Sequence, residues 1–192
     1  PILRRGGAFF LRRSFKGNRL YATVFDAYLK QILARGYSIE YFVEGGRSRT
    51  GRLLAPKGGM LAMTISSYIQ EPKRPIVFAP VYFGYEKLIE GDSFISELGG
   101  AAKQKESLFG LIRSVKSLRE NFGRVYVNIG EPIELDALLD DVRSDWRDSG
   151  AGIGEKPPWL PELVEKLGQQ IMCGVNAAAA VTPISLLAYV LL

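Results

Sequence analysis

The stretch YFVEGGRSRTGRLLAPK, residues Tyr41–Lys57, changes within a few positions from an apolar segment to a basic, glycine-rich one. Its first residues continue the run SIEYFV, Ser38–Val43, which is rich in β-branched and aromatic side chains and predicts a strand. In open α/β sheets, ligands bind beyond the carboxyl ends of the strands. We therefore expect the basic part of this stretch to be a ligand-binding loop.

The loop combines backbone freedom with donors of positive charge. Gly45 allows a sharp turn and a close approach of the main chain to a ligand. Arg47 and Arg49 present forked guanidinium groups that suit a phosphate dianion, and Ser48 adds a hydroxyl donor. The residue types thus predict a site for a small phosphorylated molecule, with a solvated basic loop as the alternative interpretation.

Glu44 is unusual in such a loop, because a carboxylate repels a phosphate group. It fits only if it orients an arginine or accepts a hydrogen bond from a substrate hydroxyl. If the loop is merely solvated, Glu44 is an ordinary member of a surface ion pair.

A second basic cluster, Arg12–Gly17, follows the apolar run Ala8–Arg12 and contains Arg13 and Lys16. We expect this run to be a strand as well. If the two strands are parallel and near neighbours, both clusters face one crevice, and about six cations would converge on one small anion.

Strand and helix patterns alternate along the chain, which predicts an α/β fold with a mostly parallel sheet flanked by helices. Residues 1–145 form this α/β part, 146–161 a loop or linker, and 162–192 a buried helical segment broken at Pro183. The predicted strands are Ala8–Arg12, Ser38–Val43, Pro75–Phe83 and Arg124–Gly130. The predicted helices lie between an N-cap at Asn18 and a stop at Gly36, over about Gly58–Tyr68, over Ser107–Asn121, and from Pro132 through Leu139.

The charge is concentrated in the first third of the chain. Residues 1–60 hold 12 Lys and Arg against 3 Asp and Glu, a net charge of about +9. Phosphorylated metabolites, anionic lipid headgroups and nucleic acid are the candidate partners. The sequence contains no histidine, so this chain supplies neither a histidine metal site nor a histidine general base. It also lacks the GxxxxGK[ST] and GxGxxG nucleotide-binding motifs, and its single cysteine, Cys173, is expected in the core.

Three stretches resemble the bacterial membrane-bound glycerol-3-phosphate acyltransferase family: GAFFLRRSFKGNRLYATVF (Gly7–Phe25), YFVEGGRSRTGRLLAPK and PIVFAPVYFGYE (Pro75–Glu86). The resemblance implies transfer of an acyl group from acyl-CoA or acyl-carrier protein to the sn-1 hydroxyl of glycerol 3-phosphate, with no cofactor and no metal. It assigns the acceptor to Arg13, Lys16, Glu44, Gly45, Arg47, Ser48 and Arg49, and the acyl-donor side to Phe10 and Pro80.

The family's HxxxxD block, whose histidine is the general base, is absent here. We expect this block upstream of Pro1, so that residues 1–145 are the C-terminal portion of an acyltransferase domain. The resemblance therefore implies that the chain alone binds anions without turnover, and that it works at the cytoplasmic face of the inner membrane as a peripheral protein.

Three alternatives remain open at the level of the sequence. The acceptor is dihydroxyacetone phosphate, or the basic third is a nucleic-acid-binding module, or the chain is a non-catalytic adaptor on an anionic membrane. Tyr21 and Phe25 fall on helical core spacing, which argues against base stacking, so we expect no nucleic-acid partner.

Overall fold

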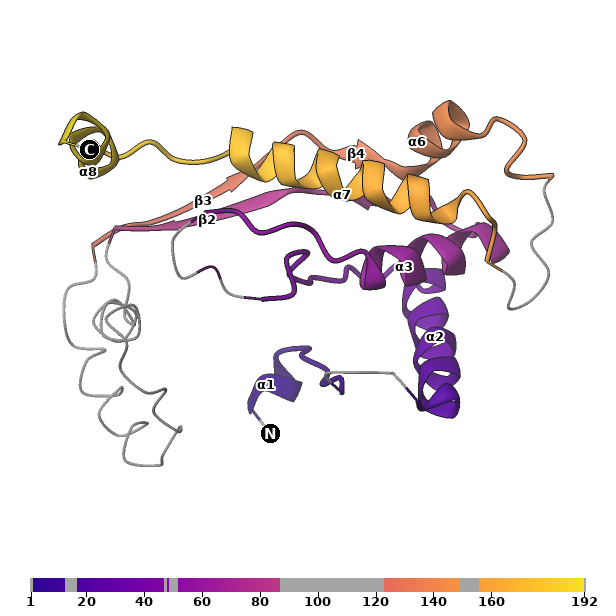
Figure 1. Ribbon diagram of the computed structural model, residues 1–192. Coiled ribbons are helices and arrows are strands. Elements are labelled where there is room, and N and C mark those ends of the chain that lie inside the picture. The colour runs from indigo at the N-terminus through magenta and orange to yellow at the C-terminus, as the bar shows by residue number, and fades with distance from the viewer. Residues whose placement is uncertain are drawn as a thin grey trace.

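The computed structural model describes residues 2–12, 17–46, 48, 52–86, 123–148 and 156–191 (Figure 1). The helices are α1 (Ile2–Arg5), α2 (Arg19–Ala34), α3 (Gly59–Gln70), α6 (Leu135–Val142), α7 (Leu160–Ala177) and α8 (Pro183–Leu191). The strands are β1 (Val77–Phe78), β2 (Val81–Tyr85), β3 (Val125–Ile129) and β4 (Ile133–Glu134). The predicted helix Ser107–Asn121 lies outside the described residues.

Helix α2 begins and ends where the sequence predicts. The Asn18 side chain accepts a hydrogen bond from the Tyr21 amide at 2.9 Å, which satisfies one of the free amides of the first turn. Gly36 follows the helix with φ of 75°. Phe25 and Leu29 are buried, and Phe9 packs on the same helix with its ring centroid 5.8 Å from that of Tyr28.

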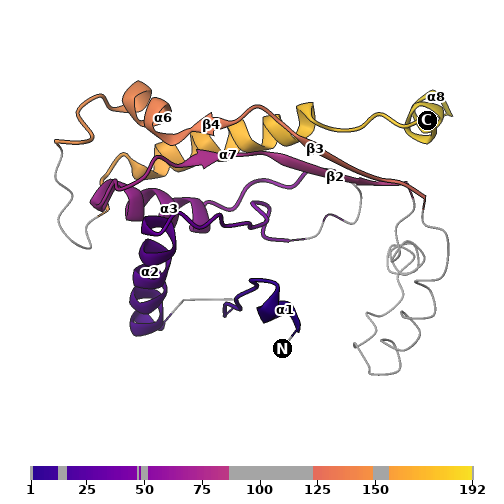
Figure 2. The same ribbon diagram turned by 180° about the vertical axis from the view of Figure 1, so that it is seen from behind.

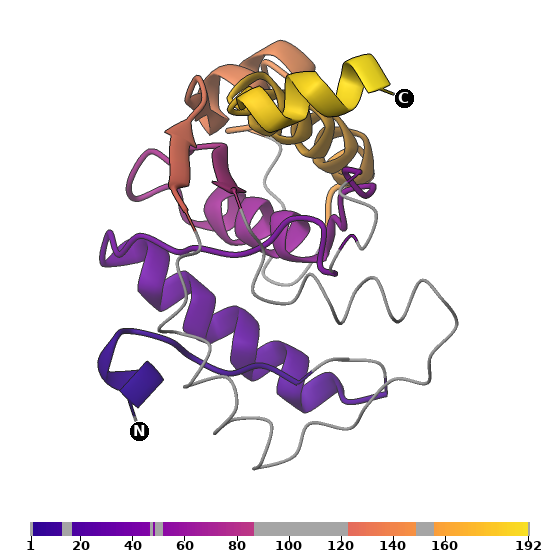
Figure 3. The same cartoon turned by 90° about the vertical axis from the view of Figure 1, so that its left-hand side faces the viewer.

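The core lies where α3, α6 and α7 meet, and α7 runs beside the strands in both the front and the reverse views (Figures 1 and 2). Seen end-on, α3 lies between α2 and the layer formed by α6 and α7 (Figure 3). The three central helices contribute fully buried aliphatic side chains, namely Leu61, Ile65, Leu135, Leu139, Leu163 and Leu167. Burial of each such side chain stabilises the fold by about 1.5–3 kcal/mol.

Trp146 joins this core from the polar segment after α6, with only 2% of its surface exposed. Its indole N–H donates to Asp140 at 2.8 Å, and the Arg147 guanidinium stacks over its ring at 4.4 Å. The Tyr68 hydroxyl donates to Asp136 beside it, and burial, followed by this hydrogen bond, raises the Tyr68 pKa. Trp146 was not predicted in the core, because its neighbours in the sequence are charged.

The predicted parallel pairing is wrong for the strands that the structure describes. β1 pairs with β4 and β2 pairs with β3, and both ladders are antiparallel. Ala8–Arg12 is not a strand, and Ser38–Val43 is extended without a strand ladder. The alternating strand and helix pattern favoured parallel pairing, but a strand's composition does not record the direction of its partner.

The apolar composition of Pro75–Phe83 predicts a strand covered on both faces, in which Pro80 marks an edge, a bulge or the end of the strand. The structure divides this stretch at Pro80 into β1 and β2, so the prediction for Pro80 is confirmed. Val77 is 52% exposed and Phe83 is 45% exposed, so the described elements leave part of these strands uncovered.

The C-terminal segment differs from the predicted buried helix pair. α7 packs in the core, whereas α8 begins at Pro183 and has no buried residue. Cys173 on α7 is exposed, so the expectation of a buried thiol is wrong.

A close contact fixes α7 against the strands. A β-carbon built on Gly174 would lie 2.7 Å from Cγ of Pro80 and 3.0 Å from its Cβ. The Pro80 carbonyl accepts a hydrogen bond from the Gly130 amide at 2.8 Å, which holds the ring in place.

We expect Gly174→Ala to destabilise the protein. The added methyl meets a rigid proline ring, and such overpacking costs about 1–3 kcal/mol, while the better helix propensity of alanine returns about 1 kcal/mol. Thermal unfolding should show a lower midpoint. The neighbouring exposed change Cys173→Ala is the control and should leave the midpoint nearly unchanged; equal midpoints for both variants would contradict the packing argument.

Candidate functional site

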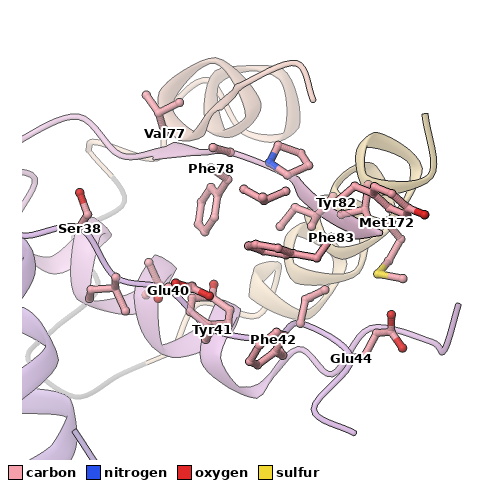
Figure 4. A pocket seen from close by; sticks show the side chains of 18 of the residues that line it. Ser38, Glu40, Tyr41, Phe42, Glu44, Val77, Phe78, Tyr82, Phe83 and Met172 are labelled. Carbon is pink, nitrogen blue, oxygen red and sulfur yellow. The ribbon is translucent and has the colours of Figure 1, made fainter. Parts of the chain in front are cut away.

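A cavity of about 1640 Å³ separates the extended segment Ser38–Glu44 from β1 and β2 (Figure 4). The rings of Phe78 and Phe83 project into this space from the strands. Side chains of α7 close one side of the cavity, namely Ile171, Met172 and Val175. The cavity is therefore mainly apolar and aromatic, with polar groups at its ends.

The glycine-rich loop begins at one end of this cavity and is closed at its base by three hydrogen bonds. The Lys57 amide donates to the Val43 carbonyl at 2.8 Å, and the Gly45 amide donates to the Phe42 carbonyl at 3.0 Å. The Leu54 amide donates to the Glu44 carboxylate at 3.1 Å. Glu44 thus binds the returning arm of its own loop, a role that the sequence analysis did not predict.

Gly45 is confirmed as a turn residue, with φ of 57° in the left-handed region that favours glycine. A β-carbon there would lie 2.9 Å from Cδ of Lys57, whose stem covers the turn. The Lys57 ammonium lies 3.5 Å from the Gly45 carbonyl oxygen. Lys57 is therefore a cation at the loop base that the sequence analysis left out of the site, although it closes the quoted stretch.

The structure brings Glu44, Ser48 and Pro80 to one cavity, since all three line it. Phe10 is 61% exposed, is not among the lining residues, and has the Arg4 guanidinium 5.9 Å from its ring. The other site residues predicted from the sequence lie outside the described residues: Arg13, Lys16, Arg47 and Arg49. Their convergence on one anion stays a prediction.

Two hydroxyls at the cavity were not predicted. Tyr41 and Thr64 both line it, and neither hydroxyl meets hydrogen-bond geometry with another group in the described part of the chain, although Thr64 lies near enough to offset part of the rise that burial causes in the Tyr41 pKa. Burial raises the pKa of Tyr41 to about 12, so this hydroxyl stays protonated at neutral pH and can donate. Within the described parts of the chain, no group of three acidic or cysteine side chains is placed to hold a metal ion.

The far end of the cavity is bordered by Tyr85, where β2 leads into Glu86. The Glu86 carboxylate accepts hydrogen bonds from the Arg124 amide and from the Tyr126 hydroxyl, each at 2.9 Å. The amide contact, then the hydroxyl contact, lowers the pKa of Glu86. Glu86 therefore ties β2 to β3 at the end opposite β1.

Comparison with known protein families identifies the class of protein to which the chain belongs. Residues 1–84 match the family described as "Acyltransferase", and residues 94–192 match the "Glycerol-3-phosphate acyltransferase C-terminal region". The chain belongs to the glycerol-3-phosphate acyltransferase family, and the resemblance drawn from its sequence is confirmed.

Individual relatives agree along the whole chain. It is 55% identical over 192 residues to a glycerol-3-phosphate acyltransferase of Xanthomonas axonopodis pv. citri, and 53% identical over 191 residues to one of Pseudomonas aeruginosa. A protein of the same name from Pseudomonas putida is 50% identical. These matches cover 100% of this chain but only 22% of the Xanthomonas protein and 23% of the two Pseudomonas proteins.

A test of Glu44 measures loop closure directly. Glu44→Ala removes the acceptor of the Leu54 amide, a hydrogen bond that contributes about 0.5–1.5 kcal/mol, so this amide should exchange with solvent about 2- to 10-fold faster. Glu44→Gln keeps an acceptor oxygen and should restore most of the protection. Hydrogen exchange of the two variants measures both; a Gln variant that exchanges as fast as the Ala variant would contradict the closure role.

Proposed function

We propose that the full-length protein transfers an acyl group from acyl-CoA or acyl-carrier protein to the sn-1 hydroxyl of glycerol 3-phosphate, giving lysophosphatidic acid. The hydroxyl oxygen attacks the thioester carbonyl, the thiol carrier leaves, and the hydroxyl proton goes to a base. This chain contributes the acceptor loop and part of the cavity beside it. Family membership together with the closed loop at the cavity end supports the proposal.

The loop is the part of this chain that we assign to the acceptor. Glu44 and Lys57 fix its base, so the described residues at both ends of the loop lie beside the cavity. We assign the phosphate to Arg47, Arg49 and the cluster with Arg13 and Lys16, because guanidinium groups bind phosphate through paired donors. Such preorganisation places a hydroxyl nucleophile at low entropic cost.

The acyl donor is assigned to the side of Pro80, as the resemblance implies. Pro80 lies where β1 ends and β2 begins and contacts Gly130 and α7, so a donor beside it need not enter the space between Ser38–Val43 and β1–β2. Phe10, predicted on the same side, stays a prediction for the assembled protein.

The base is assigned to the part of the protein outside this chain. Attack of a hydroxyl on a thioester needs a base with a pKa near the working pH. The 192 residues contain no histidine, and the Glu44 carboxylate is engaged by the Leu54 amide. The chain therefore holds the acceptor while another segment removes its proton.

The acceptor assignment is tested with Arg47→Ala and Arg47→Lys in the full-length protein. Loss of a charged hydrogen bond costs about 1.5–3 kcal/mol, so the KM for glycerol 3-phosphate should rise about 10- to 150-fold in the Ala variant. The Lys variant should recover part of this loss, and the KM for the acyl donor should stay nearly constant.

The 192-residue chain is the control for chemistry, and it should give no product. Turnover by the 192-residue chain alone would overturn the assignment of the base to another part of the protein. An unchanged KM in the Arg47→Ala variant would overturn the assignment of Arg47 to the acceptor.

We infer peripheral contact with the cytoplasmic face of the membrane. Helix α8 carries no charge, and its large side chains are exposed, including Tyr189 at 84% and Val190 at 79%. Among the described helices, none is both long and apolar enough to cross a bilayer. An exposed apolar helix in a protein with a basic first third suits insertion into an anionic interface.

Liposome flotation tests this contact. The full-length protein should float with anionic vesicles, and Leu187→Glu together with Val190→Glu should reduce the floating fraction several-fold, because charged side chains resist burial in the interface. Substitution of the exposed Gln169 on α7 by Glu is the control for added negative charge. Equal flotation of all variants would show that α8 does not contribute to membrane contact.

A further inference from the structure

The space between Ser38–Val43 and β1–β2 has the form of an unfilled position in a β-sheet. We propose that an extended, apolar segment of the full-length protein, from outside these 192 residues, inserts there and hydrogen-bonds to both main-chain edges. The proposal concerns how the chain is completed and does not depend on which acceptor is acylated.

The lining of the cavity shows that main-chain edges face it. A strand that presents only a face contributes alternate residues, because successive side chains point to opposite sides. Here every residue of Tyr37–Glu44 and every residue of Pro75–Tyr85 lines the cavity. Consecutive lining is what two opposed strand edges produce.

The ladder of β2 identifies the groups on its free edge. The Pro80 carbonyl accepts from the Gly130 amide, and the Glu86 amide donates to the Arg124 carbonyl, so the even-numbered residues bond toward β3. Hydrogen-bonded and non-hydrogen-bonded positions alternate along an antiparallel strand. Val81, Phe83 and Tyr85 therefore direct their N–H and C=O groups to the opposite edge.

The facing segment is likewise unpaired. Among the described residues, the main-chain groups of Ser38, Ile39, Glu40 and Tyr41 make no hydrogen bond. Free edges of this kind are templates for another strand, and folded proteins cover them.

The two segments also run in the same direction, from Ser38 to Glu44 and from Val77 to Phe83 (Figure 4). Helix α3 connects them in the sequence, and Tyr41 and Val43 pack with it against the core. This is the arrangement of a strand–helix–strand unit whose strands are separated by one position in the sheet. The helix is already in place, and only the position between the strands is open.

The chemistry of the edges selects a peptide as the occupant. An acyl chain would cover Phe78 and Phe83 but would leave the amides and carbonyls of both edges without partners, which is costly away from water. The rise per residue, the distance between strands and the distance between packed sheets multiply to about 160 Å³ per residue. A cavity of about 1640 Å³ therefore has room for about ten residues. A strand of five or six residues with its bulky side chains fits this volume.

The segment comes from the longer protein rather than from Ala8–Arg12. Phe9 packs on Phe25 and Tyr28 of α2, and the Arg12 guanidinium lies 4.9 Å from the ring centroid of Tyr21, which holds that run on α2. More than three quarters of the length of the relatives lies outside the matched region. The family thus has ample main chain to fill the position.

Site-specific photo-cross-linking tests the proposal in the full-length protein. Phe83→benzoylphenylalanine places the photo-reactive group at the open edge, and the same residue in place of the exposed Gln169 is the control. Mass spectrometry should find the Phe83 cross-link within the same polypeptide, on a segment outside these 192 residues. A cross-link to lipid or acyl donor, to a second copy, or to residues 8–12 would overturn the proposal.

Hydrogen exchange of the unmodified full-length protein gives a readout that needs no substitution. Alternate amides within residues 38–41, and those of Val81, Phe83 and Tyr85, should exchange as slowly as those of β3, with and without acyl donor. Fast exchange at these amides while α3 stays protected would overturn the proposal, and so would protection that appears only when acyl donor is bound. Neither cross-linking nor hydrogen exchange requires enzymatic activity. Failure of the inserted-strand proposal can therefore be distinguished from failure of the acyltransferase proposal.

Discussion

Burial of α3 is the constraint on which the rest of the structure depends. Leu61 and Ile65 of this helix are fully buried in the core that α3 shares with α6 and α7, and α3 also contacts α2. Because α3 follows the glycine-rich loop and precedes β1, its position fixes where that loop begins and where the strands start. The cavity is the space that this arrangement leaves between the two segments that α3 connects.

The acidic residue of the glycine-rich loop holds the two ends of that loop together. Glu44 holds the Leu54 amide, and Lys57 binds the main chain of the same turn. One carboxylate therefore closes a loop that otherwise carries only positive charge. The acidic side chain of this basic loop thus has a structural role, because its charge is directed to the Leu54 amide.

Packing between Pro80 and Gly174, which are distant in the sequence, positions the wall of the cavity that β2 and α7 form. Pro80 interrupts the strand and turns a carbonyl toward Gly130, while the absence of a side chain at Gly174 lets α7 approach the ring. The sequence does not predict that these two residues contact each other. They are 94 positions apart, and their relation exists only in the folded chain.

The sequence by itself determined the local structure and the family. The apolar period and the caps placed α2, the glycine permitted the turn at Gly45, and the spacing of three stretches identified the acyltransferases, since each of these depends on neighbouring residues alone. Only the tertiary structure decided the antiparallel pairing, the burial of Trp146, the exposure of α8 and the bond between Glu44 and Leu54. Pairing and burial depend on which distant segments compete for the same surface, and no local pattern records that outcome.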